Sequence, residues 1–240
     1  MLQLNDISKS FSGQTLFSDI TWRIEPGQRL GLVGANGAGK STLCRIIAGE
    51  HPADDGDMIT PRGYRVGYLP QEMPGATHDN AHTVLEEVMR GCAEVLDAQA
   101  RLREINDLLH EANKEQLGDL VDELGELEAR IDALDGHTLR PRALAILSGM
   151  GFVEGDAKRP MHELSGGWQM RVHLCRLLLS RPDLILMDEP TNHLDVPSIE
   201  WLEGFLRSYP GSVVIISHDR YFLNRMVTHI ADLDMGSLTV

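Results

Sequence analysis

A single eight-residue loop limits what this chain can fold into more than any other feature. Residues 34–41 read Gly-Ala-Asn-Gly-Ala-Gly-Lys-Ser, which fits the phosphate-binding pattern G-x-x-x-x-G-K-[ST] at every fixed position. A short apolar run of the buried-strand kind, Leu30–Val33, precedes the loop, and a helix is predicted from about Lys40 to Ala48. Because this pattern requires a strand before it and a helix after it, the sequence predicts a P-loop fold.

The chemistry of the loop explains its residue types. Glycines let the backbone curl so that successive N–H groups point at phosphate oxygens, and the start of the helix adds partial positive charge. Lys40 is expected to reach the β- and γ-phosphates of a nucleotide, and the Ser41 hydroxyl to ligate Mg²⁺. The alternative is a chance glycine-rich turn, which the flanking elements argue against. The expected nucleotide contacts in this region are Gly34, Asn36, Gly37, Ala38, Gly39, Lys40, Ser41 and Thr42.

Two carboxylates end a second apolar run. Leu184–Met187 leads directly into Asp188 and Glu189. Acids at the end of a buried strand are costly unless they meet a metal or a reacting water. Asp188 therefore fits a Mg²⁺-organising position, and Glu189 fits a general base that polarises the attacking water. Such a pair is a weak signal alone, since acids often cap turns, and it gains weight from the phosphate loop.

The remaining pattern predicts an α/β fold. The first 30 residues show loose strand alternation, broken at Ser12-Gly13 and Pro26-Gly27. The last third alternates helices with strands, which favours a mainly parallel sheet flanked by helices. The elements expected there are helices at about Gly166–Leu179, Ser198–Arg207 and Tyr221–Met226 and strands at Leu184–Met187 and Val213–Ser217; Tyr64–Leu69 is a further strand candidate.

From about Thr83 to Leu134 the spacing of apolar residues is helical, with a polar break near Asn113. Two interpretations carry equal weight: a short antiparallel coiled coil, or an ordinary amphipathic pair packed on the domain. Residues 76–140 hold six arginines and lysines against 16 aspartates and glutamates. An acidic hairpin binds RNA phosphates poorly, so it would contact a basic protein, use its few arginines, or be a solvated pair with no partner.

Composition excludes several classes of protein. The chain has 240 residues and a net charge of −14, which disfavours nucleic acid or an anionic membrane as a partner of the whole surface, so a nucleic-acid contact would need a local basic patch. No apolar run approaches the roughly 20 residues of a membrane span, and the first residues lack a secretion signal. The three cysteines, Cys44, Cys92 and Cys175, form no C-x-x-C pair, which favours the reducing cytoplasm.

A third motif identifies a family. Residues 164–169, Leu-Ser-Gly-Gly-Trp-Gln, resemble the signature motif of the ATP-binding cassette (ABC) superfamily. A serine and two glycines at a helix start form a second anion cradle. In that family the cradle contacts ATP held by an opposing cassette, so two cassettes enclose two nucleotides head to tail. The resemblance assigns this role to Ser165, Gly166, Gly167 and Trp168, with Trp168 replacing the usual glutamine.

The resemblance covers essentially the whole chain and implies further roles. Gln71 matches the glutamine that touches Mg²⁺ and the attacking water, and His218 matches the histidine that contacts the γ-phosphate and orients the catalytic glutamate. Asp195 matches the loop that communicates across the dimer. Phe11 matches the aromatic residue that stacks on adenine, with core packing as its alternative. The resemblance thus implies that Ser41, Gln71 and Asp188 bind Mg²⁺. It implies that Glu189, His218 and Gln71 are the catalytic residues.

Three features resemble the ABC-F branch, whose members act on ribosomes and carry no transmembrane domains. They are the string at residues 189–195, the string at 217–223, and the long helical stretch between Gln71 and Ser165. Members normally carry two cassettes, and we expect this chain to be the first cassette of a tandem protein. The expected partners are ATP, a second cassette and the ribosome.

The alternatives belong to other classes. The first is the ATP-binding subunit of a membrane transporter, which would have a shorter stretch after Gln71. The second is a DNA-repair or chromosome ATPase, which would have longer coiled coils or zinc cysteines. A module that senses ATP without turnover is the third, and the intact Glu189, Gln71 and His218 argue against it. The expected organisation is one domain over 1–240: a β-subdomain and P-loop core at 1–75, a helical subdomain at 76–165 with an arm at 83–134, and the rest of the core at 166–240.

Overall fold

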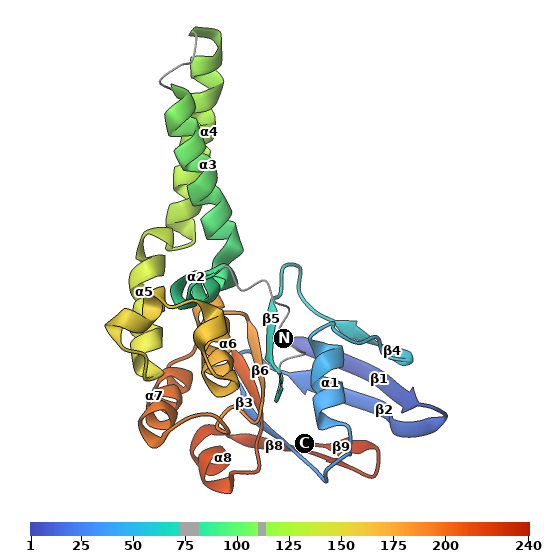
Figure 1. The fold of residues 1–240 in the computed structure, drawn as a ribbon. Coiled ribbons are helices and arrows are strands. Elements are labelled where there is room, and N and C mark those ends of the chain that lie inside the picture. Colours follow the sequence, from blue (N-terminus) through green and yellow to red (C-terminus); the bar gives the residue numbers. More distant parts are fainter. Residues whose placement is uncertain (73–81, 110–113) are drawn as a thin grey trace.

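The computed structural model describes residues 1–72, 82–109 and 114–240, with the side chains of 114–116 left out. The predicted break near Asn113 lies outside these ranges. Two sheets and a set of helices make up the fold (Figure 1). The strands are β1 Leu2–Phe11, β2 Gln14–Ile24, β3 Arg29–Val33, β4 Asp55–Ile59, β5 Val66–Leu69, β6 Leu184–Asp188, β7 Ser212–Ile216, β8 His229–Asp234 and β9 Ser237–Thr239.

The larger sheet confirms the predicted α/β class. Its six strands run in the order β5-β6-β7-β3-β8-β9, and all neighbouring pairs are parallel except β8 with β9. Side chains of β6 alternate between two cores, as a strand covered on both faces requires. Ile185 and Met187 face a helical core, whereas Leu184 and Leu186 face a core shared with the small sheet.

The second sheet is antiparallel, in the order β2-β1-β4, and matches the predicted N-terminal β-subdomain. One face of it, which includes Trp22 and Phe17, is buried in a core shared with helix α1, Lys40–Ile47. Strand β4 was missed by the sequence prediction, which expected only a polar stretch after Gly49. All five of its residues are exposed, so it shows no alternation of buried and exposed positions.

Helices α2, α5, α6, α7 and α8 pack in the core on the other side of the large sheet from α1 (Figure 1). Helix α7 begins two residues earlier than predicted because Asp195 caps it, and α5 and the β8–β9 hairpin were not predicted at all. The helices are α2 Val84–Met89, α3 Ala93–Leu109, α4 Lys114–Ala133, α5 Leu139–Gly149, α6 Gly166–Ser180, α7 Val196–Arg207 and α8 Arg220–Met226. None of those in the described ranges has the length and apolar character that crossing a membrane requires.

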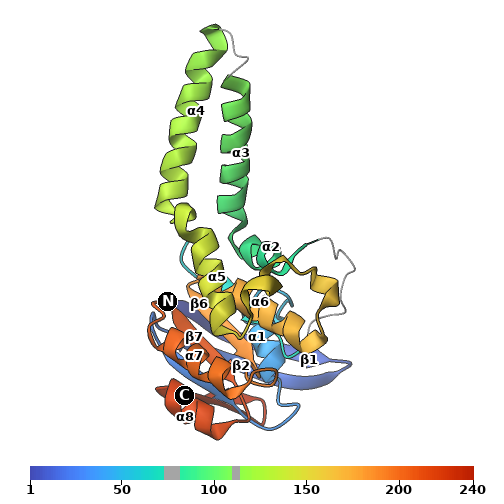
Figure 2. The ribbon, with the colours of Figure 1, turned by 60° about the vertical axis from the view of Figure 1, so that its left-hand side comes forward.

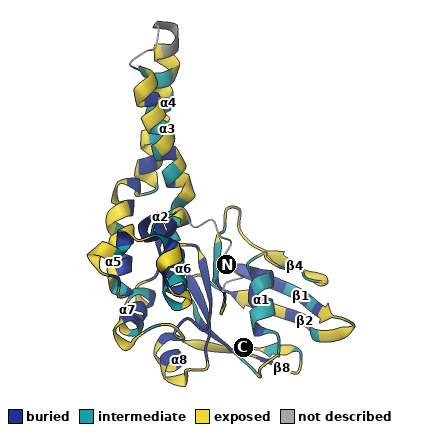
Figure 3. Ribbon diagram, viewed as in Figure 1, coloured by how far each residue is buried: buried dark blue, intermediate teal, exposed yellow. Residues whose placement is uncertain are grey.

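Helices α3 and α4 form the predicted hairpin arm, which projects from the body rather than packing along it (Figures 1 and 2). Ile105 and Ile131 are buried between them, and the Arg101 guanidinium contacts both carboxylate oxygens of Glu123 at 2.7 and 2.9 Å. The expected apolar seam does not run the full length, because Leu117 and Val121 are exposed. The buried residues of the arm are concentrated at its base (Figure 3). The predicted subdomain boundaries at residues 75 and 165 remain a prediction.

Candidate nucleotide-binding site

Most of the predicted nucleotide contacts line one pocket. It has a volume of about 620 Å³ and lies where β3, β6 and β7 end, as expected for a ligand site at the carboxyl edge of a parallel sheet. The structure brings together residues more than 200 positions apart in the chain. The lining residues are Phe11, Leu16, Asn36, Gly37, Gly39, Lys40, Ser41, Thr42, Gln71, Asp188, Glu189, Ile216 and His218. Gly34 and Ala38 belong to the same loop but do not line the pocket.

Two glycines of the phosphate loop are required by the backbone. Gly39 caps α1 with φ of 104°, and a Cβ there would lie 2.9 Å from side-chain atoms of Leu16 and Phe17. Gly34 has φ of 144°, and a Cβ there would lie 2.2 Å from the carbonyl oxygen of Leu233. Both conformations strongly disfavour any other residue. The loop is therefore held against the small sheet and β8 in a shape that only glycine allows.

Lys40 closes the loop on itself. Its ammonium group donates hydrogen bonds of 2.9 Å to the carbonyl oxygens of both Gly34 and Ala35. The side chain is buried, yet its residue lines the pocket, and no carboxylate of the described residues lies within ion-pair distance of it. Its acceptors are thus backbone carbonyl oxygens, and no neighbouring carboxylate of the described residues is paired with it. The site therefore holds a cation at the start of a helix, an arrangement suited to a polyphosphate.

Asp188 and Glu189 lie opposite this cation. Asp188 is the last residue of β6 and is buried, while Glu189 follows it with φ of 51°, an uncommon backbone conformation for a residue with a side chain. The Glu189 amide still donates to the Ile216 carbonyl oxygen at 2.8 Å, so the strained residue is fixed by the neighbouring strand. Strain that a sheet enforces in this way is typical of functional positions.

The Glu189 carboxylate is buried but incompletely bonded. Its Oε1 atom has no hydrogen-bond partner within the described residues and lies 3.7 Å from Nε2 of His218. Burial raises the pKa of Glu189, and the nearby His218 and Lys40 oppose this rise while Asp188 adds to it. A carboxylate with a raised pKa and a free oxygen facing a pocket is chemically suited to accept a proton.

The donor atoms fit a hard divalent cation. Ser41, Gln71 and Asp188 offer a hydroxyl, an amide carbonyl and a carboxylate, which are the oxygen ligands that Mg²⁺ takes together with phosphate oxygens. The described residues contain no group of three or more His, Cys, Asp or Glu arranged around a metal. Such a cation would thus be held jointly by these three residues and a nucleotide, rather than by a cage of protein ligands.

Leu16 and Ile216 were not predicted as lining residues, and the position of Phe11 distinguishes between its two predicted roles. Leu16 and Ile216 supply apolar walls, but nothing in their local sequence distinguishes them from core residues. Phe11 ends β1 and is 49% exposed, so it is not a core residue. Its ring has the Lys9 ammonium 5.5 Å from its centroid. Phe11 thus presents a largely open aromatic face at the rim of the pocket, which favours base stacking over core packing.

The signature residues lie outside this pocket. Ser165 caps the 15-residue helix α6, and its side chain makes no capping hydrogen bond. Ser165 and Gly166 are exposed, and Trp168 packs edge-on against Phe152 with centroids 4.8 Å apart. No residue of this second cradle lines the pocket that holds Lys40. The chain therefore carries two separate helix starts with the residue types expected of an anion cradle.

Arg171 connects the second cradle to the loop that follows Glu189. Its guanidinium lies 4.4 Å from the Trp168 ring centroid and donates to the His193 carbonyl oxygen at 2.7 Å. It also lies 3.5 Å from Asp195, whose other carboxylate oxygen accepts from the Ser198 amide and caps α7. These hydrogen bonds lower the pKa of Asp195, and those from Ser198 have the largest effect. The predicted communication residue is thus tied directly to the signature helix.

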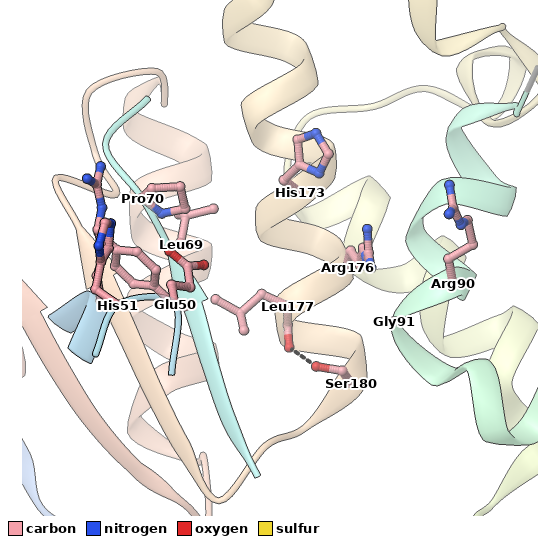
Figure 4. Close-up of a pocket in the computed structure, with 12 residues that line it drawn as sticks. Glu50, His51, Leu69, Pro70, Arg90, Gly91, His173, Arg176, Leu177 and Ser180 are labelled. Carbon is pink, nitrogen blue, oxygen red and sulfur yellow. Dashed lines mark hydrogen bonds between the residues drawn. The ribbon is translucent and has the colours of Figure 1, made fainter. Parts of the chain in front are cut away.

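A second pocket, of about 640 Å³, is lined in part by Leu69 and Pro70 (Figure 4). One wall carries Arg90, His173 and Arg176, and the other carries Glu50 and His51. The buried Glu87 pairs with Arg176 at 2.8 Å and with Arg90 at 3.0 Å. Burial lowers the pKa of His173, which lies 4.0 Å from the same carboxylate. This pocket lacks a phosphate loop and an acid pair, so the nucleotide chemistry belongs to the first one.

Comparisons with known proteins agree with this arrangement. A family model described as "ABC transporter" matches residues 17–192. "ABC transporter F family member 2" of Arabidopsis thaliana is 40% identical over 238 residues, which are 98% of this chain and 35% of that protein. "Energy-dependent translational throttle protein EttA" of Haemophilus influenzae is 43% identical over 221 residues, 92% of this chain and 39% of that protein. The chain thus spans about a third of the length of the curated relatives it matches.

Solved structures share the fold. The "Structure of ATP binding subunit of ABC transporter" superposes with a TM-score of 0.73 at 19% identity, covering 100% of this chain and 88% of that one. The family match covers the P-loop, the acid pair and the signature, while the F-branch relatives extend over nearly all of this chain, arm included. The chain belongs to the ATP-binding cassette family and, across almost its entire length, resembles the ATP-binding cassettes of the F branch.

Proposed function

We propose that this chain binds Mg-ATP in the pocket around Lys40 and hydrolyses it when a second cassette covers the site. The observation that supports this most strongly is the meeting, in one pocket, of Lys40 at a helix start, buried Asp188, and a strained Glu189 beside His218. No other described pocket joins a cation, a helix start and a carboxylate with a free oxygen.

The binding step follows from the loop. The triphosphate would take the place of the Gly34 and Ala35 carbonyls as the partner of the Lys40 ammonium. Loop N–H groups and the start of α1 would stabilise the remaining phosphate charge, and Phe11 would stack on the base. Mg²⁺, held by Ser41, Asp188 and Gln71, supplies neutralisation of charge on the β- and γ-phosphate oxygens.

The hydrolysis step depends on Glu189. Its free carboxylate oxygen would accept a proton from a water placed in line with the γ-phosphate, and His218 would hold this carboxylate in position. Gln71, at the rim of the same pocket, would orient that water. Attack of this water on the γ-phosphorus would break its bond to the bridging oxygen, and Lys40 would stabilise the charge that develops on the departing ADP.

The covering cassette supplies the other cradle. Ser165 and Gly166 are exposed at the start of α6 and lie outside the Lys40 pocket, so a single chain does not close its own site. A second cassette would present its signature serine to the nucleotide held here. This chain would in turn present Ser165 to a nucleotide held there, and Arg171 would link that contact to Asp195.

We further propose that the cassette acts on ribosomes from the cytoplasm, with the closed, ATP-bound state gripping its target. The support is the resemblance to F-branch relatives, one of which is named a translational throttle protein, together with the projecting arm. The arm gives no support to the alternative that this chain is the ATP-binding subunit of a membrane transporter.

Co-sedimentation tests the proposal. The Glu189→Gln chain should pellet with purified ribosomes in Mg-ATP and stay in the supernatant with Mg-ADP. Lys40→Ala with Glu189→Gln is the matched control and should stay in the supernatant with either nucleotide. Equal pelleting with both nucleotides, or none with either, would contradict the ribosome proposal while leaving ATP binding to be measured separately.

A further inference from the structure

Four arginines gather at the edge of the large sheet opposite the nucleotide pocket. Arg62 and Arg65 come shortly before β5, Arg181 lies between α6 and β6, and Arg142 lies on α5. The nucleotide pocket is built at the carboxyl ends of β3, β6 and β7, whereas these arginines flank the amino ends of β5 and β6. We call Arg62, Arg65, Arg142 and Arg181 the arginine patch.

Hydrogen bonds hold three members together. The Arg65 guanidinium donates to the Arg181 carbonyl oxygen at 3.1 Å, and that of Arg142 donates to the Leu179 carbonyl oxygen at 3.3 Å. Both acceptors lie at the end of α6, so these bonds fix two side chains beside the same helix terminus. Arg62 and Arg181 both line an adjoining hollow of about 420 Å³, which Tyr64 and Tyr209 also line.

The patch has cations without matching anions. Within residues 1–72, 82–109 and 114–240, none of the four guanidiniums has a carboxylate oxygen within 4.0 Å. Asp183 accepts a 2.8 Å hydrogen bond from the backbone amide of Arg65, and Asp135 interacts electrostatically with Arg142 without forming an ion pair. Burial lowers the pKa of Arg142, and the charge of Arg181 lowers it further. Four guanidiniums without an ion pair among the described residues thus belong to a chain whose net charge is −14.

The hydrogen bonds of these groups leave most of their donors open. A guanidinium has five N–H donors, and the side chains of Arg65 and Arg142 each use one of them in a bond to the protein. Arg62, Arg65 and Arg181 are exposed, so their remaining donors face solvent. Clustered arginines with free planar donors match phosphate oxygens, which accept such bonds in pairs. A polyanion placed here would also relieve the repulsion among the guanidiniums.

We propose that the arginine patch is an RNA-binding surface that contacts the phosphodiester backbone, with the half-buried Tyr64 beside it. The choice of RNA rests on the proposed action on ribosomes. Electrostatic attraction of the whole chain to RNA is excluded by its charge, so contact must be local, and the patch supplies that local surface. The N-terminus, which lines the same hollow, lies nearer to the arm than the C-terminus does in both ribbon views (Figures 1 and 2).

Fluorescence anisotropy with a dye-labelled 20-nucleotide oligouridylate, without nucleotide, tests the proposal. The triple variant Arg62→Gln, Arg65→Gln, Arg181→Gln should bind on the order of tenfold more weakly in low salt. The slope of log affinity against log salt should fall by about 2, because each phosphate that an arginine neutralises adds roughly 0.7 to it. The matched control is Arg23→Gln, Arg159→Gln, Arg220→Gln, which removes the same charge from exposed arginines outside the patch and the arm and should bind nearly as wild type.

Further measurements distinguish a loss of RNA binding from a loss of folding or of nucleotide binding. Thermal unfolding and ATP affinity are measured in both triple variants, so that a folding defect or a failed nucleotide site is recognised independently of RNA binding. If the patch variant does not fold, the single change Arg62→Glu on its exposed loop should still weaken RNA binding several-fold. Equal weakening in the two triple variants, an unchanged salt slope, or displacement of RNA by polyglutamate of equal length would each overturn the proposal, the last in favour of an acidic protein partner.

Discussion

Nε2 of His218 lies 3.7 Å from Oε1 of Glu189, and that oxygen has no hydrogen-bond partner among the described residues. The two residues reach this position from different strands. Glu189 follows β6, His218 follows β7, and the two strands pair in parallel so that Asp188 lies beside Ile216. Glu189 is buried and His218 is exposed. This pair sets the expected pH behaviour of the site.

The acid limb of the turnover profile should lie at a higher pH than an ordinary glutamate would give. Burial raises the pKa of Glu189, and a base must be ionised, so turnover should fall as the pH drops through that raised pKa. His218 favours the ionised form, so His218→Gln should move the limb to still higher pH besides lowering turnover. Steady-state ATPase rates across the acid range check this, with exposed His229→Gln as the control. A limb that stays in place in the His218 variant would contradict the assigned interaction.

Glu189→Gln should retain ATP binding, lose nearly all hydrolysis and favour the closed dimer. The amide cannot accept the proton, and it also removes a negative charge near the γ-phosphate. Phosphate release and size-exclusion chromatography in Mg-ATP measure the two effects, and the exposed Glu154→Gln serves as the control. Turnover at the wild-type rate in Glu189→Gln would assign the base to another residue.

Lys40→Ala should abolish ATP binding at micromolar nucleotide. The change removes the cation at the helix start and leaves the Gly34 and Ala35 carbonyl oxygens without their donor. Titration with a fluorescent ATP analogue measures the loss, and Lys158→Ala, at an exposed position, should bind as wild type. Unchanged affinity in Lys40→Ala would mean that this loop does not hold the phosphates.

Asp195→Ala should lower the free energy of unfolding by about 1 kcal/mol, because α7 loses its N-cap. Asp195→Asn should cost much less, since asparagine also caps helices. The pKa of Asp195 is lowered in the folded chain, so its contribution is present above the unfolded pKa and disappears as the pH falls through the folded one. Urea unfolding of the three proteins at neutral and acid pH checks both statements. Equal stability of Asp195→Ala and wild type at neutral pH would show that the cap contributes nothing.

The features predicted correctly from the sequence are those that depend on the spacing of residues close together in the chain. The phosphate loop requires glycine at residues 34 and 39 for backbone reasons, and the uninterrupted apolar run of β6 follows from burial on both faces. Both signals lie within a few residues, so they can be recognised without the fold. The helical hairpin was predicted for the same reason, from its apolar spacing.

The missed features depend on contacts between distant residues. Strand β4 is an exposed edge with no alternation, so only its pairing with β1 makes it a strand. Arg171 joins Trp168, His193 and Asp195 across more than 20 residues, and Leu16 reaches the pocket only because the small sheet packs on α1. The arginine patch likewise draws on residues over 100 positions apart.

The central claim is that one cassette cannot complete its own site. The Lys40 pocket includes no signature residue, and we therefore propose that each chain takes Ser165 from another. A tethered partner offers an effective concentration on the order of millimolar, which a dilute single cassette lacks, and a net charge of −14 on each copy opposes pairing.

The most direct measurement is the ATPase activity per chain over a wide range of protein concentration at saturating Mg-ATP, for wild type and Ser165→Arg. The account predicts weak activity that rises with concentration and is partly restored by salt at low concentration, and little activity at any concentration in Ser165→Arg. Activity per chain that is independent of concentration, or full activity in Ser165→Arg, would show that hydrolysis occurs within a single cassette.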